Sequence, residues 1–245
     1  MVVTLPDVAF TQLIFEQGIV QGGVTCAGFS TGQGSGSGSF DIYIEPGSTI
    51  KKAYFFTYRQ RYPPPATFVL NGSNYVFDTT NLLMDVNYAH IYASPSRLYY
   101  MDITNDINPS TLTYNVTIPD QAGLPINAGY WTFFLFVVYE NPLLSTICYN
   151  VIINEHDFLG NEFYNINNLN PINTSGSVGF SLYTDRMGSS PFINTPSHEV
   201  FFNSNLLGVV GGSDSNSSSW AGSGVKGHFY YQNSSLFGLD DDIPN

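Results

Sequence analysis

The chain has 245 residues, of which 43% are hydrophobic and 16% aromatic, which is ample for a buried core and excludes a disordered chain. Only 11% are charged, and 7 basic against 19 acidic residues give a net charge of −12, whose average field repels a nucleic-acid backbone. A surface rich in Gly, Ser, Asn, Thr and Tyr with so little charge is typical of extracellular or virion-exposed proteins.

The N-terminal residues carry neither a basic leader nor an apolar run that ends in small residues. We therefore expect a protein made in the cytoplasm without a signal peptide. The longest apolar stretch, Trp131 to Tyr139, is about half the ~20 residues of a membrane-spanning helix, and its aromatic and β-branched residues favour a buried strand. The sequence predicts no membrane span.

The first predicted strands are also the clearest. Residues 39–45 place Phe40, Ile42 and Ile44 on one face, with the period of two that a half-buried strand shows, and Pro46-Gly47 ends the run. Residues 52–58 form the next predicted strand. Residues 67–70 and 74–77 flank Asn71-Gly72-Ser73, which predicts a hairpin because Asn-Gly accepts the positive φ of a tight turn.

More strands are expected along the rest of the chain, separated by Gly, Pro, Asn or Ser, at 97–103, 111–118, 131–140, 147–154, 178–184, 199–202 and 225–231. At most one short helix, around residues 81–86, is predicted. Many short strands with turn residues between them indicate an all-β fold, an antiparallel β-sandwich of the jelly-roll kind.

The Gly/Ser-rich residues 31–39 have too little side chain to pack, and we expect a loop there. Residues 165–175 and 211–219 are two further predicted loops, and neither has the length or charge of an interdomain linker. The chain is therefore interpreted as one domain over residues 1–245, with a division near residue 125 as the alternative.

Four of the seven basic residues, Lys51, Lys52, Arg59 and Arg61, alternate with aromatic residues in the predicted strand at 52–58. This could be a nucleic-acid surface, but no nucleic-acid motif accompanies it and the chain is acidic overall. We interpret the patch as a strand whose charged ends reach water, and we expect no nucleic-acid partner.

Potential catalytic or zinc-binding residues gather at Glu155-His156-Asp157 and at His198-Glu199. The spacing of zinc ligands is absent, and neighbours on a strand point to opposite faces, so solvated turn residues are the preferred interpretation. No serine or cysteine nucleophile motif and no phosphate-binding loop is present.

The densest acidic group, Asp240-Asp241-Asp242, could bind calcium together with Asp214, because Ca²⁺ prefers carboxylate and carbonyl oxygens. Its spacing matches no calcium loop, so an acidic tail is the other interpretation, and no cofactor is predicted apart from a possible calcium ion. Cys26 and Cys148 are expected to be two buried reduced thiols and not a disulfide. Sequons at Asn71, Asn115, Asn173, Asn216 and Asn233 are expected to be unused.

A resemblance runs through much of the chain. It is carried in order by residues 50–56 (IKKAYFF), 68–72 (FVLNG), 100–104 (YMDIT), 131–140 (WTFFLFVVYE), 203–212 and 236–242 (LFGLDDD). This succession is similar to the repeat domains of large bacterial surface adhesins. The resemblance implies a β-sandwich used at a surface, with no catalytic residues. As a single copy rich in Asn and Tyr, the chain also resembles proteins of large DNA viruses of the marseillevirus kind.

Three functional hypotheses follow. The first is a non-catalytic structural or surface protein, associated with a virion, that meets protein partners in an assembly and could form oligomers. The second is a carbohydrate-binding module, with or without assistance by calcium, in which Trp220 offers an aromatic face to surface glycans while Trp131 belongs to the core. The third is a glycoside hydrolase, which needs two carboxylates in a cleft, such as Glu140 and Glu155. We expect no enzyme.

Overall fold

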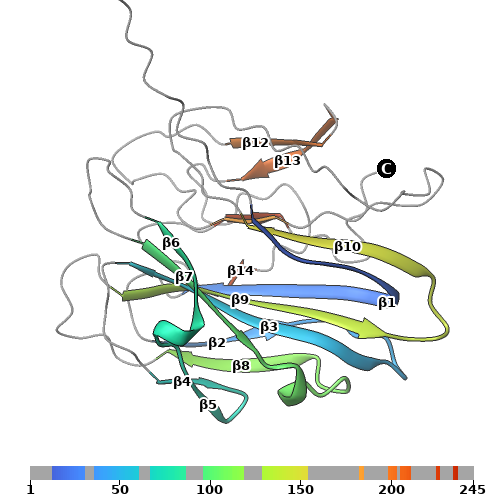
Figure 1. Cartoon of the computed structure of the whole chain (residues 1–245), viewed down its shortest axis with the longest axis horizontal. Helices are drawn as coiled ribbons and strands as arrows, with labels where there is room; N and C mark the ends of the chain where they lie inside the picture. Colours follow the sequence, from blue (N-terminus) through green and yellow to red (C-terminus); the bar gives the residue numbers. More distant parts are fainter. Residues whose placement is uncertain are drawn as a thin grey trace, which may run out of the picture.

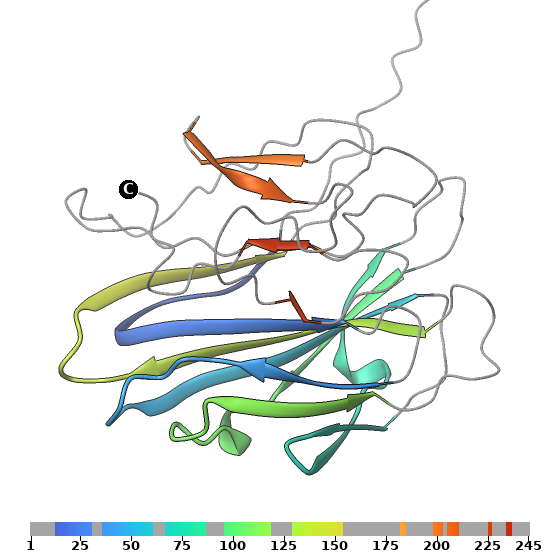
Figure 2. The same cartoon turned by 180° about the vertical axis from the view of Figure 1, so that it is seen from behind.

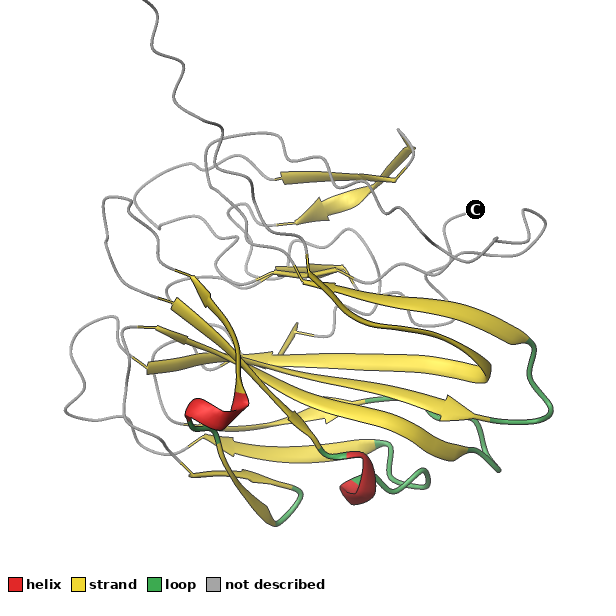
Figure 3. Ribbon diagram, in the orientation of Figure 1, coloured by secondary structure: helices red, strands yellow, loops and turns green. Residues whose placement is uncertain are grey.

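A computed structural model of the chain describes residues 13–30, 36–60, 67–86, 96–118, 129–153, 182–184, 198–202, 205–210, 225–226 and 234–236 (Figures 1 and 3). Nearly all of them lie in strands or the turns between strands, which are β1 (Leu13–Ser30), β2 (Gly36–Asp41), β3 (Thr49–Gln60), β4 (Thr67–Leu70), β5 (Ser73–Val76), β6 (Leu82–Val86), β7 (Ser96–Asp102), β8 (Thr113–Ile118), β9 (Gly129–Glu140), β10 (Thr146–Ile153), β11 (Leu182–Thr184), β12 (His198–Phe202), β13 (Asn205–Val210), β14 (Val225–Lys226) and β15 (Ser234–Leu236). Two 3₁₀ turns, η1 (Thr79–Asn81) and η2 (Thr104–Asp106), are the helices of this part of the chain.

Two antiparallel sheets pack together as a β-sandwich, so the predicted fold class is confirmed. The large sheet has the order β10-β1-β9-β3-β7-β6, with β14 added in parallel beside β1. The small sheet has the order β2-β8-β4-β5 and lies below the large sheet in Figures 1 and 2. The pairs β11-β15 and β12-β13 form two further two-stranded sheets.

The first core lies between the two sheets. Alternate residues of β3 and β9 point into it, among them Phe55, Phe133 and Leu135, all of which are fully buried. The small sheet contributes Phe68 and Tyr114 from its inner face. The aromatic rings meet one another closely, since the Phe68 and Phe133 centroids are 4.9 Å apart. The period-two pattern of these strands thus fills one layer with large apolar side chains.

Strand β1 is bent, and the bend creates a second packed layer. Residues 22–30 pair with β9, whereas residues 13–21 pair with β10 and form with it a two-stranded ribbon. Figure 1 shows the chain turning back at the right-hand end of β1. Glycines are needed there, because a Cβ at Gly22 would collide with the backbone of Tyr139 and one at Gly23 with the ring of the same residue.

The ribbon of β10 and residues 13–21 covers the second face of the large sheet. Phe15 packs edge-on against three rings of β3 and β7, with centroid distances of 4.9 Å to Tyr54, 5.1 Å to Phe56 and 5.0 Å to Tyr100. Because β9 lies between β1 and β3 in the sheet, these contacts can form only across the face. The second core joins Phe15 to buried residues such as Val138 and Tyr149. The large sheet is therefore a middle layer with an apolar face on each side.

Most predicted strands are confirmed, and the Asn71-Gly72 hairpin is correct in detail. Its turn residues have φ values of 48° and 86°, and the backbone N–H of Asn71 donates to the carbonyl of Asn115 at 2.7 Å. Strands β1, β13 and β15 were not expected from the sequence. The described residues of the predicted strands at 178–184 and 225–231 lie in β11 and β14, and the other residues of these two predictions lie outside the described part of the chain.

Two predictions were wrong. The short helix expected at 81–86 is strand β6, because Leu82 and the residues after it pair with β7, and only the 3₁₀ turn η1 precedes it. The loop expected at 31–39 is strand from Gly36 onward, because the backbone of this Gly/Ser segment pairs in full register with β8. Residues 31–35 lie outside the described part of the chain.

Cys26 and Cys148 are not joined in a disulfide, as expected, but only Cys26 is buried and Cys148 is exposed. Cys26 lies in the second core, whereas Cys148 is on β10 opposite Ile19. Within the described ranges, no helix is long and apolar enough to cross a membrane.

Candidate functional site

The residues singled out for ligand and calcium binding, Trp220, Asp214 and Asp240, Asp241 and Asp242, all lie outside the described residues, as do Glu155-His156-Asp157. His198 and Glu199 begin β12, opposite Val210 and Val209 of β13. Trp131 lies in strand β9. Among the described residues, no group of three or more His, Cys, Asp or Glu side chains could hold a metal ion.

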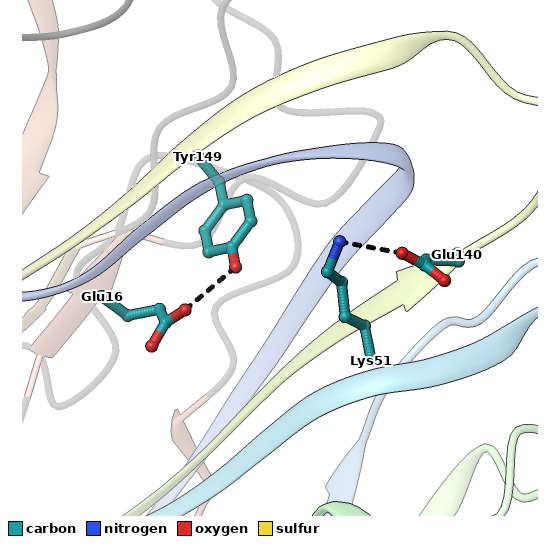
Figure 4. Close-up of polar contacts among 4 residues, drawn as sticks. All are labelled: Glu16, Lys51, Glu140 and Tyr149. Atoms are coloured by element: carbon teal, nitrogen blue, oxygen red, sulfur yellow. Dashed lines mark hydrogen bonds and ion pairs between the residues drawn. The ribbon is translucent and has the colours of Figure 1, made fainter.

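Glu140, one of the two carboxylates suggested for a hydrolase, ends β9 and forms an exposed ion pair. Its Oε1 lies 2.8 Å from Nζ of Lys51 on the neighbouring strand β3 (Figure 4). The chain then enters the turn at Asn141 and Pro142, as Tyr-Glu-Asn-Pro predicts. Lys51, the first residue of the basic patch, is thus occupied by a carboxylate. Tyr54, Phe55 and Phe56 of that patch are buried in the two cores.

A partly buried carboxylate beside the second core holds the ribbon to the large sheet. Glu16 of β1 accepts hydrogen bonds from the hydroxyl of Tyr54 at 2.9 Å and from the hydroxyl of Tyr149 at 3.2 Å. Figure 4 shows the Tyr149 ring directed at this carboxylate. Tyr54 belongs to β3 and Tyr149 to β10, so one acidic side chain connects the two layers.

Burial and this carboxylate both keep the two tyrosines protonated. Burial is the larger cause of the raised pKa of Tyr54, and the hydrogen bond to Glu16 adds to it. Burial and the charge of Glu16 raise the pKa of Tyr149 to about 12. A phenol with such a pKa is a poor acid or base at neutral pH, and the arrangement suits packing better than proton transfer.

A similar tyrosine–carboxylate pair lies at the small sheet. The hydroxyl of Tyr75 donates to Oδ2 of Asp106 at 2.9 Å, and burial together with this bond raises the pKa of Tyr75 to about 12. The bond ties β5 to η2, which follows β7 of the large sheet. It connects the two sheets just as Glu16 connects the ribbon to the large sheet.

The outer face of the small sheet is open, and most of its side chains are polar. We call this surface the polar face; its residues on the paired strands β2 and β8 are Ser37, Ser39, Asp41, Thr113, Asn115 and Thr117. On β4 and β5 it continues with Thr67, Val69, Asn74 and Val76. Every residue between them on β8 is buried, so the alternation places all polar side chains outward.

The polar face has a regular geometry. The register aligns Ser37, Thr117, Val69 and Asn74 in one row across all four strands. The hydroxyls of Ser37 and Thr117 are 3.0 Å apart and share a hydrogen bond. With strands about 4.8 Å apart and about 3.3 Å per residue, the face measures roughly 14 Å across the strands and 20 Å from Ser37 to Tyr43. Asp41 is its one charged side chain among the described residues.

Tyr43 forms the rim of the polar face beyond Asp41. The alternation of β2 continues past its last residue, because Ile42 and Ile44 are buried while Tyr43 is 44% exposed. Its backbone N–H donates to Oγ1 of the buried Thr25 at 3.1 Å, and the neighbouring Ile42 N–H donates to the carbonyl of Leu112 at 2.8 Å. The segment that carries this aromatic ring is therefore fixed to both sheets.

The outer side of the ribbon is a second open surface of a different kind. Its paired residues include Ile19 opposite Cys148, and Gln17 opposite Asn150. Ile14 and Ile19 are 41% and 51% exposed, and the strands carry no charged side chain on this side. Uncharged surface with exposed isoleucines is typical of protein contacts.

Sequence reasoning did not find the polar face. Its signal was present, because residues 113–118 alternate Thr, Asn and Thr with Tyr, Val and Ile. The pattern shows that one side is polar, but only the register with β2 and β4 shows that the polar sides of neighbouring strands form one surface.

Comparison of the chain with protein-family models, with curated proteins and with solved structures finds no match. The fold class, an all-β sandwich, comes from the structure alone. The likeness to adhesin repeats and to proteins of large DNA viruses stays a prediction.

Proposed function

We propose that the protein is a non-catalytic structural or surface protein that acts through the surface of its β-sandwich, as a component exposed on a particle such as a virion. It is made in the cytoplasm and joins its partners by surface contact. Other proteins of the assembly are the partners that this function requires.

The observation that carries the proposal is how two carboxylates between the layers of the sandwich are used, of which Glu16 is partly buried and Asp106 is exposed. Glu16 and Asp106 each accept a hydrogen bond from a tyrosine of another layer, and the tyrosines have raised pKa values. These groups stabilise the packing of one layer on another. Glu140 lies outside the cores in an exposed ion pair. Among the described residues, the large side-chain faces left for function are the polar face and the outer side of the ribbon.

The outer side of the ribbon supports assembly with other proteins. Ile19 is half exposed on a rigid pair of strands and has no charged neighbour across the ribbon, where Cys148 lies. Side chains held on paired strands lose little entropy when they are covered, which favours binding.

Localisation in the source organism tests this proposal. Intact particles or cells are labelled with a reagent that does not cross a membrane or capsid, and the protein is then purified and its labelled fraction measured. The proposal predicts that the protein is labelled, for example at the exposed Cys148, and that it is enriched together with structural proteins. Recovery only as an unlabelled protein from the soluble interior would contradict it.

Binding of surface carbohydrates is the second candidate, and the composition of the polar face favours it. Hydroxyl and carboxamide side chains on the small sheet, with one exposed tyrosine at the rim, offer hydrogen bonds and an aromatic face together. Assistance by calcium would depend on Asp214 and Asp240–Asp242, and chelation of divalent ions tests that part of the proposal.

A further inference from the structure

The polar face is the described surface whose chemistry most narrowly limits a partner. The whole chain carries 19 acidic residues, yet this face contains a single carboxylate, Asp41, and no basic side chain. A strongly charged ligand would find at most the one counter-charge of Asp41 on it. A purely apolar ligand would contact Val69 and Val76 but would leave the hydroxyls and carboxamides without partners. The surface therefore matches a partner that is polar, uncharged and rich in hydroxyls.

We propose that the polar face binds a neutral oligosaccharide, which lies along β2 and β8 with one sugar ring against the ring of Tyr43. This inference rests on the second candidate function, and it names the site and the ligand class. Asn115, near the centre of β8, offers both a donor and an acceptor, and the Ser37–Thr117 hydroxyl pair offers the same at the other end of the face.

The rigidity of the face strengthens this assignment. Tyr43 is fixed through its backbone to Thr25, and the turn at Asn71 is fixed to the carbonyl of Asn115. The side chains opposite the face, such as Tyr114 and Phe68, are fully buried in the first core. Short side chains on a packed sheet lose little entropy on binding, so even a shallow surface can bind an extended ligand.

A panel of oligosaccharides tests the proposal. The full-length protein is screened on an array that holds neutral gluco-, xylo-, manno- and N-acetylglucosamine oligomers beside sulfated and sialylated glycans, with calcium and with chelator. The proposal predicts saturable binding to at least one neutral oligomer of three or more sugars. Binding confined to the acidic glycans, or no binding at all, would overturn it.

Variants of the full chain then locate the site by calorimetry with the bound oligomer. Asn115→Ala and Tyr43→Ala should each weaken binding by about three- to tenfold, the effect of one lost hydrogen bond or ring contact. Tyr43→Phe keeps the ring and should bind as the parent does. Asn105→Ala and Ile19→Ala remove exposed side chains elsewhere and serve as controls. Equal affinity of all five variants would show that the ligand binds elsewhere and would overturn the assignment.

Two additional readouts separate this inference from the non-catalytic function. Mass spectrometry of the bound oligomer after prolonged incubation should show it intact; shortened products would contradict the non-catalytic proposal while leaving the binding site in place. Light scattering across protein concentrations examines the other occupant, a second copy. Self-association that Thr117→Lys abolishes would assign the polar face to that contact and overturn the glycan proposal.

Discussion

Replacement of Phe15 by alanine should destabilise the protein strongly, because this one side chain fastens the ribbon to the large sheet. Phe15 is half-buried and meets three rings at centroid distances of 4.9 to 5.1 Å. Loss of half-buried apolar area costs about 1.5 kcal/mol. Three edge-on ring contacts add about 1.5 to 3 kcal/mol. The expected loss in free energy of unfolding is therefore about 3 to 4.5 kcal/mol, within the range measured for Phe→Ala substitutions.

Urea unfolding followed by circular dichroism measures this loss. Ile14→Ala is the matched control, since Ile14 neighbours Phe15 but is 41% exposed on the outer side of the ribbon, and it should cost less than about 1 kcal/mol. Phe15→Leu keeps apolar volume and should recover part of the loss. If Phe15→Ala costs no more than Ile14→Ala, the ribbon does not pack on the large sheet as described.

Three further predictions concern titration, a buried amide and the bend of β1. The pKa values of Tyr75 and Tyr149 are about 12, against about 10 in an unfolded chain, so they stabilise the fold fully below pH 10 and this stabilisation is lost as the pH rises to 12. Unfolding curves should show a loss of up to about 3 kcal/mol per tyrosine. An absorbance titration at 295 nm in which all tyrosines ionise near pH 10 would contradict this prediction. Asn141 is 3% exposed; its side chain donates to the Pro46 carbonyl and to Ser48 Oγ and accepts from the Leu143 N–H. Asn141→Ala should lower the free energy of unfolding, measured in denaturant, by about 2 to 3 kcal/mol. A loss below about 0.5 kcal/mol would show that this turn does not depend on Asn141. Gly22→Ala should reduce thermal stability markedly because the new Cβ meets the backbone of β9, and an unchanged melting temperature would argue against the sharp bend.

The parts of the fold that depend on neighbouring residues could be predicted from the sequence. The hairpin at Asn71-Gly72 was correct because its turn and its alternation are both local. The strand at residues 131–140 was recognisable because it is apolar on both sides, which fits its place in the middle of a sheet with two cores.

Glycines and long-range contacts explain what the sequence did not show. Strand β1 contains Gly18, Gly22 and Gly23, which indicate turns in an isolated segment but here make room for the rings of Tyr149 and Tyr139. Leu82 and the residues after it have no pattern that distinguishes a helical turn from an edge strand until β7 pairs with them. The contact between Phe15 and Tyr54 joins residues far apart in the chain, and only the fold-back of β1 explains it.

The two native cysteines allow the most direct test of the central structural claim, that the large sheet is covered on both faces and leaves the polar face as the open face of the sandwich. Cys26 lies beneath the ribbon at 7% exposure, whereas Cys148 lies on its outer side. A variant with Asn115→Cys, in which both native cysteines are replaced by serine, places a single thiol on the polar face. With a water-soluble thiol reagent, Cys148 and the thiol at position 115 should react fast, and Cys26 should react at least a hundredfold more slowly. Cys26 reacts only when the structure opens locally, and this opening costs about 3 kcal/mol or more. Equal rates for Cys26 and Cys148 would contradict the covered second face and, with it, the choice of the polar face as the recognition surface.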